Sequence, residues 1–236
     1  MAAFHPQIVH FAIALLVVGV LFRAVSLLGR PAFVGPAALA LLLLGATGAV
    51  FAVQSGIAAH GPVERIPGAR AAVVEHEEWG ERTRNVFFGV IAIEAVALLL
   101  LRSPKKRYVH AASAVVGLVG LFCLYETASA GGRLVYSYAG GVGIRSGDPA
   151  DVERLLLAGL YHQAQAERKA GRPAEASALL TQAGQRFRND PEVQLAAAES
   201  LLVDRKDSAA ALAALEGITP PRENRALRIR HGLLTA

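Results

Sequence analysis

The stretch HPQIVHF, His5–Phe11, opens the first long apolar segment of the chain. Pro6 suits the first turn of a helix, where the N–H that it lacks would have no partner in any case. Residues 7–29 are almost all apolar, and Arg23 is their one charge. A helix of about 20 such residues can cross a lipid bilayer. The stretch therefore predicts a membrane helix that has two histidines at its entrance.

The composition extends this prediction to most of the chain. Of its 236 residues 53% are hydrophobic, and the mean hydropathy of +0.40 is too high for an ordinary soluble protein. Breaks that contain glycine or proline separate the apolar segments and force neighbouring helices to run antiparallel. We therefore expect an all-α fold that begins with a four-helix transmembrane bundle, with helices at about residues 7–29, 32–59, 69–102 and 108–129.

The loop after the third segment sets the orientation of the bundle. It carries four positive charges, Arg102, Lys105, Lys106 and Arg107. Such loops stay in the cytoplasm, so we expect both termini on the periplasmic or outer side of the inner, cytoplasmic membrane. The positive excess lies beside membrane segments, which indicates contact with lipid and no binding of nucleic acid.

The stretch GGRLVYSYAGGVG, residues 131–143, follows the fourth segment. Its glycines and its alternating large side chains predict a short extended element or a turn, because glycine is a poor helix former.

Residues 147–236 have a different texture from residues 1–146, and we predict two domains with this boundary. Alanine and leucine recur with a helical period, and a motif typical of tetratricopeptide repeats occurs twice, 35 residues apart. The known period of these repeats is about 34 residues. We therefore expect a small tetratricopeptide-like domain of helical hairpins. The motif residues are Gly171, Ala176, Leu180 and Ala183, and then Lys206, Ala211, Leu215 and Ile218.

Four histidines should gather at the outer end of the bundle. Imidazole is a ligand for haem iron, zinc and copper, so a b-type haem between histidines of different helices is one interpretation. His76 is the first choice of ligand, because Gly80 lies one turn away on the same face. His5 or His10 would be the second ligand, and His60 is third in line. Another metal, or histidines that hydrogen-bond carboxylates and carbonyls at the interface, are the alternatives.

Glu94 is an acid in the middle of the third apolar segment, 18 residues after His76 and so on the same helix face. An intramembrane acid suggests a proton path or a quinone pocket. It could equally be a protonated acid that bonds a neighbour such as Thr47. His110, beside the positive loop, is expected to meet lipid headgroups.

Some classes of enzyme have no support in the sequence. No Ser–His–Asp set, phosphate-binding loop, HExxH or paired CxxC motif is present, and the single cysteine, Cys123, rules out a disulfide within the chain. A non-catalytic subunit is favoured over an enzyme.

Three motifs together resemble one known family. HPQIVHFAIALL, VEHEEWGE and GGRLVYSYAGGVG occur in this order, as in the membrane family called domain of unknown function 2231, and the resemblance covers roughly residues 1–145. The chain departs from the family pattern at Ala12, where a proline is usual, and in TASAGG, where a histidine often precedes the two glycines. The family sometimes occurs joined to Rieske-type or cytochrome domains. The resemblance therefore implies membrane redox chemistry, with cytochromes or iron–sulfur proteins as possible partners.

Two functions from different classes follow from these observations. The first is an integral membrane subunit of a redox or electron-transfer complex that binds haem b or quinone near its outer face. The second is a non-enzymatic membrane anchor or scaffold, whose helical-repeat domain recruits or stabilises partner proteins.

Overall fold

The computed structural model describes residues 1–29, 31–100, 103–145 and 148–236. In these residues the regular structure is helical and no strand occurs, which confirms the predicted all-α fold. The chain divides into two compact units, Met1–Gly147 and Asp148–Ala236. We call them the membrane unit and the C-terminal unit, and describe each by itself.

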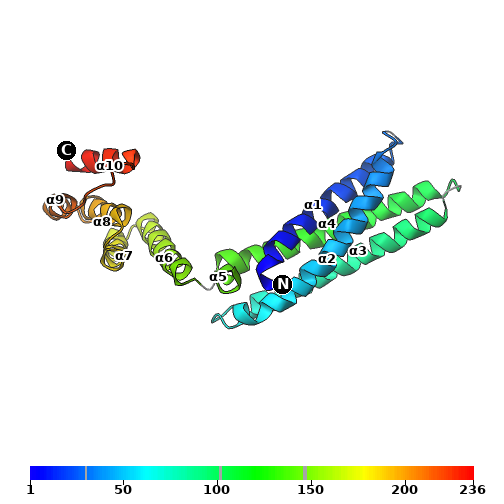
Figure 1. Cartoon of the computed structure of the whole chain (residues 1–236), viewed down its shortest axis with the longest axis horizontal. Helices are drawn as coiled ribbons and strands as arrows, with labels where there is room; N and C mark the ends of the chain where they lie inside the picture. The colour runs from blue at the N-terminus through cyan, green and yellow to red at the C-terminus, as the bar shows by residue number, and fades with distance from the viewer. Residues whose placement is uncertain (30, 101–102, 146–147) are drawn as a thin grey trace. The chain divides into compact units, whose positions relative to one another are not determined.

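The membrane unit is built on four long helices among its described residues. Each packs against the next in the chain, and α1 also packs against α4, so α1 and α3 lie diagonally across the unit. The transitions from α1 to α2 and from α3 to α4 lie at one end, here called the hairpin end (Figure 1). The N-terminus, the α2–α3 turn and two short helices lie at the other, the N-terminal end (Figure 1). The elements are η1 (Ala2–Phe4), α1 (His5–Ser26), α2 (Val34–Glu64), α3 (Arg70–Leu99), α4 (Lys106–Tyr136) and α5 (Gly140–Arg145).

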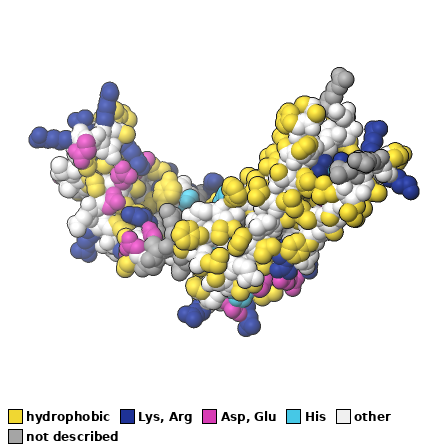
Figure 2. Space-filling model, turned by 45° about the vertical axis from the view of Figure 1, so that its right-hand side comes forward, with side chains coloured by type: hydrophobic (Ala, Val, Ile, Leu, Met, Phe, Trp, Pro, Cys, Tyr) yellow, Lys and Arg dark blue, Asp and Glu magenta, His cyan; other side chains and the backbone are white. Residues whose placement is uncertain are grey.

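Three helices in the described part of the chain are long and apolar enough to cross a membrane: Ala2–Ser26, Val34–Glu64 and Lys106–Tyr136. Hydrophobic side chains cover much of the visible flank of the membrane unit (Figure 2). The first half of α3 carries several charged side chains, among them Glu75, Glu78, Glu81 and Arg82. Helix α3 is therefore not counted with the three helices that are long and apolar enough to cross a membrane. The fourth membrane span therefore stays a prediction.

The expected extended element at residues 131–143 is wrong. Helix α4 continues to Tyr136, well past the predicted end at residue 129, and α5 begins at Gly140. The physical reason is packing, because Gly131 lies against the ring of His76. A Cβ atom at Gly131 would lie 2.8 Å from Cε1 of that ring. A close contact between α4 and α3 thus outweighs the low helix propensity of glycine.

The second hairpin, α3–α4, repeats the burial pattern of the first, α1–α2. Leu16, Gly19 and Arg23 are buried on α1, and the residues 71 positions later, Phe87, Val90 and Glu94, are buried on α3. The same offset relates buried residues of α2 to those of α4: Leu42 to Ser113, Ala46 to Gly117, Ala49 to Gly120, Ala59 to Ala130 and Val63 to Leu134. The membrane unit therefore consists of two similar hairpins in series.

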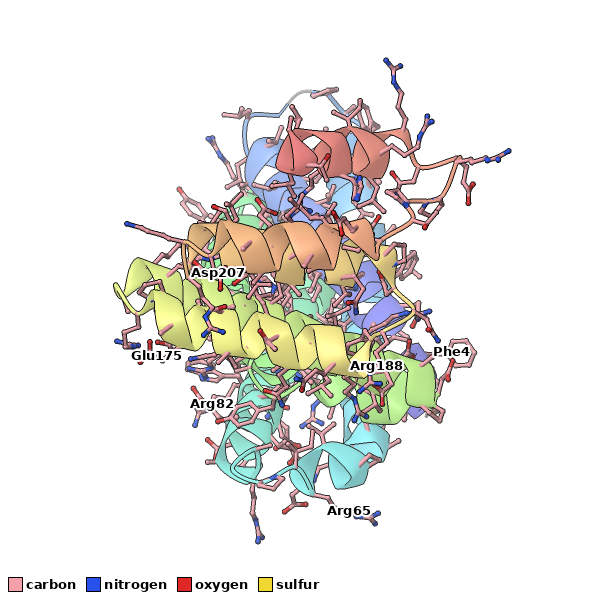
Figure 3. The ribbon with its side chains drawn as sticks, turned by 90° about the vertical axis from the view of Figure 1, so that its left-hand side faces the viewer. Phe4, Arg65, Arg82, Glu175, Arg188 and Asp207 are labelled. Carbon is pink, nitrogen blue, oxygen red and sulfur yellow. The ribbon has the colours of Figure 1, made fainter. Side chains whose placement is uncertain are left out.

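The C-terminal unit consists of helices that each pack against the next in the chain. Side chains of Asp148, Asp190, Asp207 and Asn224 accept hydrogen bonds from the first backbone N–H groups of α6, α8, α9 and α10. Asp207 lies at the start of α9 (Figure 3). The helices described here are α6 (Pro149–Lys169), α7 (Pro173–Arg186), α8 (Pro191–Val203), α9 (Ser208–Glu216) and α10 (Arg225–Thr235).

The repeated motif occupies equivalent places in two helical hairpins. Its alanine and leucine positions are buried: Ala176, Leu180, Ala183, Ala211 and Leu215. The first motif position has a left-handed backbone both times, with φ +75° at Gly171 and φ +54° at Lys206. The helical hairpins are observed, whereas their tetratricopeptide character stays a prediction.

The left-handed backbone at Lys206 gives a stability prediction. A side chain in this conformation costs roughly 1–2 kcal/mol, of which the extra chain entropy of glycine offsets a part. Lys206→Gly should therefore raise the free energy of unfolding of the C-terminal unit by about 0.5–1 kcal/mol. Hydrogen exchange of α8 and α9 in the full chain measures this change. The control is Lys169→Gly at the last residue of α6, which should have the opposite sign. Faster hydrogen exchange in Lys206→Gly than in the wild type would contradict the prediction.

An ion pair joins the end of α6 to the end of α8. Nε and Nη2 of Arg168 donate to the two oxygens of Asp204 at 2.7 and 2.6 Å, and the hydroxyl of Ser200 donates to the same carboxylate. The hydrogen bond from Arg168 holds the pKa of Asp204 below its usual value. Stability from a depressed carboxyl pKa is present above the unfolded-state pKa and is lost as the pH falls through the folded-state pKa.

We therefore expect Asp204→Asn to lower the stability of the C-terminal unit near pH 7. The difference from the wild type should shrink as the pH falls below about 3.9, the ordinary pKa of aspartate. Hydrogen exchange of α6 and α8, corrected for the intrinsic rate at each pH, follows both proteins. Glu216→Gln, on the exposed side of α9, is the matched control. A difference that stays constant down to pH 2 would count against the role of this ion pair.

Candidate functional site

Two histidines face each other across the interior of the membrane unit at its N-terminal end. His5 is the first residue of α1, and His76 lies in the first half of α3. Their ring centroids are 6.2 Å apart and the ring planes are nearly perpendicular, at 81°. The structure therefore brings together the first-choice histidine and one of the two second choices.

The hydrogen bonds of the two histidines indicate which nitrogen of each ring carries the proton. Nδ1 of His76 donates to the backbone carbonyl of Thr127 at 3.0 Å. Nδ1 of His5 lies 2.9 Å from the hydroxyl of Ser55, which itself donates to Ala52. The hydroxyl must then accept from His5. Both imidazoles thus carry their proton on Nδ1, and neither Nε2 atom has a hydrogen-bond partner among the described residues.

Glycines line both rings. A Cβ atom at Gly56 of α2 would lie 3.2 Å from Cε1 of His5. A Cβ atom at Gly131 of α4 would lie even closer to His76, 2.8 Å from its Cε1. The sequence suggested Gly80 as the glycine beside His76. A Cβ atom at Gly80 would instead have the side chains of Thr127 and Val53 as its nearest neighbours, both at 3.9 Å. The glycine that makes room beside His76 is therefore Gly131 and not Gly80.

The other two histidines at this end lie outside the pair. His10 is exposed, and its Nδ1 donates to the carbonyl of Pro6 one turn earlier. The ring of His60 lies between two carboxylates, with Nδ1 3.2 Å from Glu64 and Nε2 3.2 Å from Glu77. His60 has the surroundings expected of an interfacial histidine bound to carboxylates.

A buried ion pair bridges the same two helices near the hairpin end. Nε and Nη2 of Arg23 donate to the two oxygens of Glu94 at 2.7 and 2.5 Å. The side chains are only 2% and 1% exposed. The hydroxyl of Ser113 on α4 also donates to Glu94. Because arginine binds both oxygens, Glu94 is the ionised partner of a pair.

The expected neighbour of Glu94 is therefore wrong. The hydroxyl of Thr47 donates to the backbone carbonyl of Leu43 in its own helix and not to the carboxylate of Glu94. From the sequence, Arg23 was known only as the one charge in residues 7–29. The signal that could have identified its partner is the spacing: Arg23 precedes Glu94 by 71 residues, and His5 precedes His76 by the same number.

The expectation that His110 faces lipid headgroups is also wrong. Its side chain is 18% exposed, and its Nδ1 lies 3.6 Å from Oε2 of Glu94. Ser113 follows three residues later and reaches the same carboxylate, which shows that this face of α4 points into the unit. No clue in the sequence separated this face from the lipid-facing one.

The geometry offers two nitrogen ligands at the N-terminal end. Among the described residues no group of three or more His, Cys, Asp or Glu side chains is placed to hold a metal ion.

The buried ion pair gives the third prediction. Arg23→Leu leaves an unpaired buried carboxylate and should cost about 3–5 kcal/mol of stability. The double variant Arg23→Leu/Glu94→Leu should be clearly more stable than either single variant, because apolar groups then replace both charges. Melting temperatures in detergent compare the three proteins.

Arg70→Leu is the control for this comparison. It breaks an exposed ion pair with Glu64 on the same unit and should cost less than about 1 kcal/mol. A double variant as unstable as the sum of the single variants would show that the two charges act independently.

Comparison with known proteins gives one match. The model of the family DUF2231, described as a predicted membrane protein, matches residues 1–144. No curated protein and no solved structure matches the chain.

Proposed function

The chain belongs to the DUF2231 family of predicted membrane proteins, and we propose that it is an integral membrane subunit of a redox complex. In this proposal His5 and His76 hold a b-type haem at the N-terminal end of the membrane unit. The observation that carries it is the pair of facing imidazoles on different helices, each with its Nδ1 engaged and its Nε2 unengaged.

The spacing of the two rings supports ligation of one metal ion. A metal–imidazole bond is about 2 Å long, so two imidazoles that bound one ion would have their ring centroids no more than roughly 6 Å apart. The observed separation is 6.2 Å. The glycines at positions 56 and 131 make room for the two imidazoles, because a Cβ atom there would lie 3.2 Å from Cε1 of His5 and 2.8 Å from Cε1 of His76.

The residues around the rings have a defined task in this proposal. The hydroxyl of Ser55 and the carbonyl of Thr127 fix the orientation and the tautomer of the imidazoles. When bound, haem supplies one-electron transfer. Donor and acceptor proteins would then be membrane or peripheral partners such as cytochromes or iron–sulfur proteins.

The alternative is a membrane anchor without a cofactor. The helical hairpins of the C-terminal unit favour it, because stacked hairpins commonly present binding surfaces for other proteins. The histidine pair would then serve only to pack the N-terminal end of the membrane unit.

An absorption spectrum separates the two functions. The full chain, produced in haem-replete cells and purified in detergent, should show a b-type band in the reduced-minus-oxidised difference spectrum. His76→Ala and His5→Ala should each abolish this band while the protein remains in the membrane, because each removes one of the two residues that would hold the haem.

Two histidine variants serve as matched controls. His10→Ala should keep the band, since that side chain is exposed and bonded to its own helix. His110→Ala should keep it as well, since that residue lies beside Glu94 at the other end of the unit. A colourless, iron-free wild-type protein would overturn the haem proposal and leave the anchor in its place.

A further inference from the structure

The hairpin end of the membrane unit holds a second polar site, which the redox proposal does not use. It consists of Arg23, Glu94, Ser113 and His110, contributed by α1, α3 and α4. We propose that this cluster is a proton-exchange site, in which His110 takes up one proton from the solution at the hairpin end and binds it against Glu94.

The hydrogen bonds of Glu94 leave one acceptor position for this proton. A carboxylate offers about four acceptor positions. Arg23 supplies two donors and Ser113 a third. Nδ1 of His110 faces the carboxylate at 3.6 Å and is buried, yet it has no hydrogen-bond partner among the described residues. A proton on this nitrogen would complete the set of donors around the acid.

The charged groups around His110 determine what one added proton does to the net charge of the cluster. Arg23 on α1, Glu94 on α3 and Lys106 on α4 are the charged groups that act on it within the described structure. Arg23 and Glu94 form a neutral pair, so an added proton on His110 gives the buried cluster a single positive charge. Proton uptake forms one N–H bond, takes the proton from water, and draws the imidazolium toward Oε2 of Glu94.

The internal repeat shows that packing does not require these polar groups. The positions 71 residues before His110 and Ser113 are Leu39 and Leu42 of α2. The first hairpin thus has two leucines where the second has a histidine and a serine. Titratable groups inside a membrane protein are costly and are characteristic of sites that move protons or ions.

The location of His110 allows exchange with solvent. It lies one turn inside the start of α4, and its side chain is 18% exposed, whereas Glu94 is 1% exposed. Histidine is also the side chain whose ordinary pKa, about 6.5, suits exchange near neutral pH. His110 therefore stands between the solution and the buried carboxylate.

Nuclear magnetic resonance of the full chain in lipid nanodiscs, with ¹⁵N-labelled histidine, tests the proposal. The signal of His110 is assigned by its loss in His110→Asn. It should change from the neutral to the doubly protonated form between about pH 8 and pH 5. The proton on Nδ1 should show the downfield shift of a hydrogen bond to a carboxylate.

Glu94→Gln tests the partner. Without the carboxylate charge, the midpoint for His110 should fall by at least about one pH unit, a tenfold loss of proton affinity. His162, exposed on α6, should titrate identically in both proteins. If Glu94→Gln does not fold, the downfield Nδ1 proton of the wild type still decides the question.

Two results would overturn the proposal. One is a His110 that keeps a single protonation state throughout this pH range. The other is a titration without the downfield proton, or with the same midpoint in Glu94→Gln, since His110 would then be an ordinary histidine with no link to the buried pair.

Discussion

The ion pair between Arg23 and Glu94 sets the register of the membrane unit. It joins α1 to α3 diagonally, and these helices run in the same direction. The facing histidines lie 18 residues earlier on each helix, which is five full turns or about 27 Å. A slide of one helix along the other would break both contacts together. The interaction at one end therefore determines the geometry at the other.

The cost of charge in an apolar environment explains why this pairing is specific. Burying an unpaired arginine or glutamate inside the unit would cost far more free energy than apolar packing contributes. Registers that separate Arg23 from Glu94 are therefore strongly disfavoured. Between the two polar ends lies a continuous apolar layer that includes Leu16, Leu42 and Phe87. Leu16, Leu42 and Phe87 pack against glycines of neighbouring helices, where a Cβ atom would lie 2.7, 3.1 and 2.8 Å from them, so the apolar contacts and the polar groups fix the same register.

The sequence predicted helices and approximate boundaries because apolar length and helix breakers are local properties. It also predicted that histidines would gather at one end, and the family resemblance was confirmed over residues 1–144. It failed where tertiary contacts decide. Gly131 stays helical because it packs on His76. The partner of Glu94 was missed because the rotation of each helix about its axis is not visible in an almost wholly apolar segment. A search for constant offsets between polar residues would have supplied that information.

The tandem arrangement of the two hairpins has a consequence for how such a protein could arise. In a homodimer of one hairpin, twofold symmetry would place identical residues opposite each other. Two histidines can meet in this way, and so can two glycines or two leucines. An arginine would then meet an arginine, and a glutamate a glutamate, with like charges forced together in lipid. Joining the hairpins in one chain lets the two halves diverge, so that opposite charges can occupy equivalent positions. The histidine pair is compatible with a symmetric ancestor, whereas the ion pair requires two hairpins of different sequence, which this chain supplies.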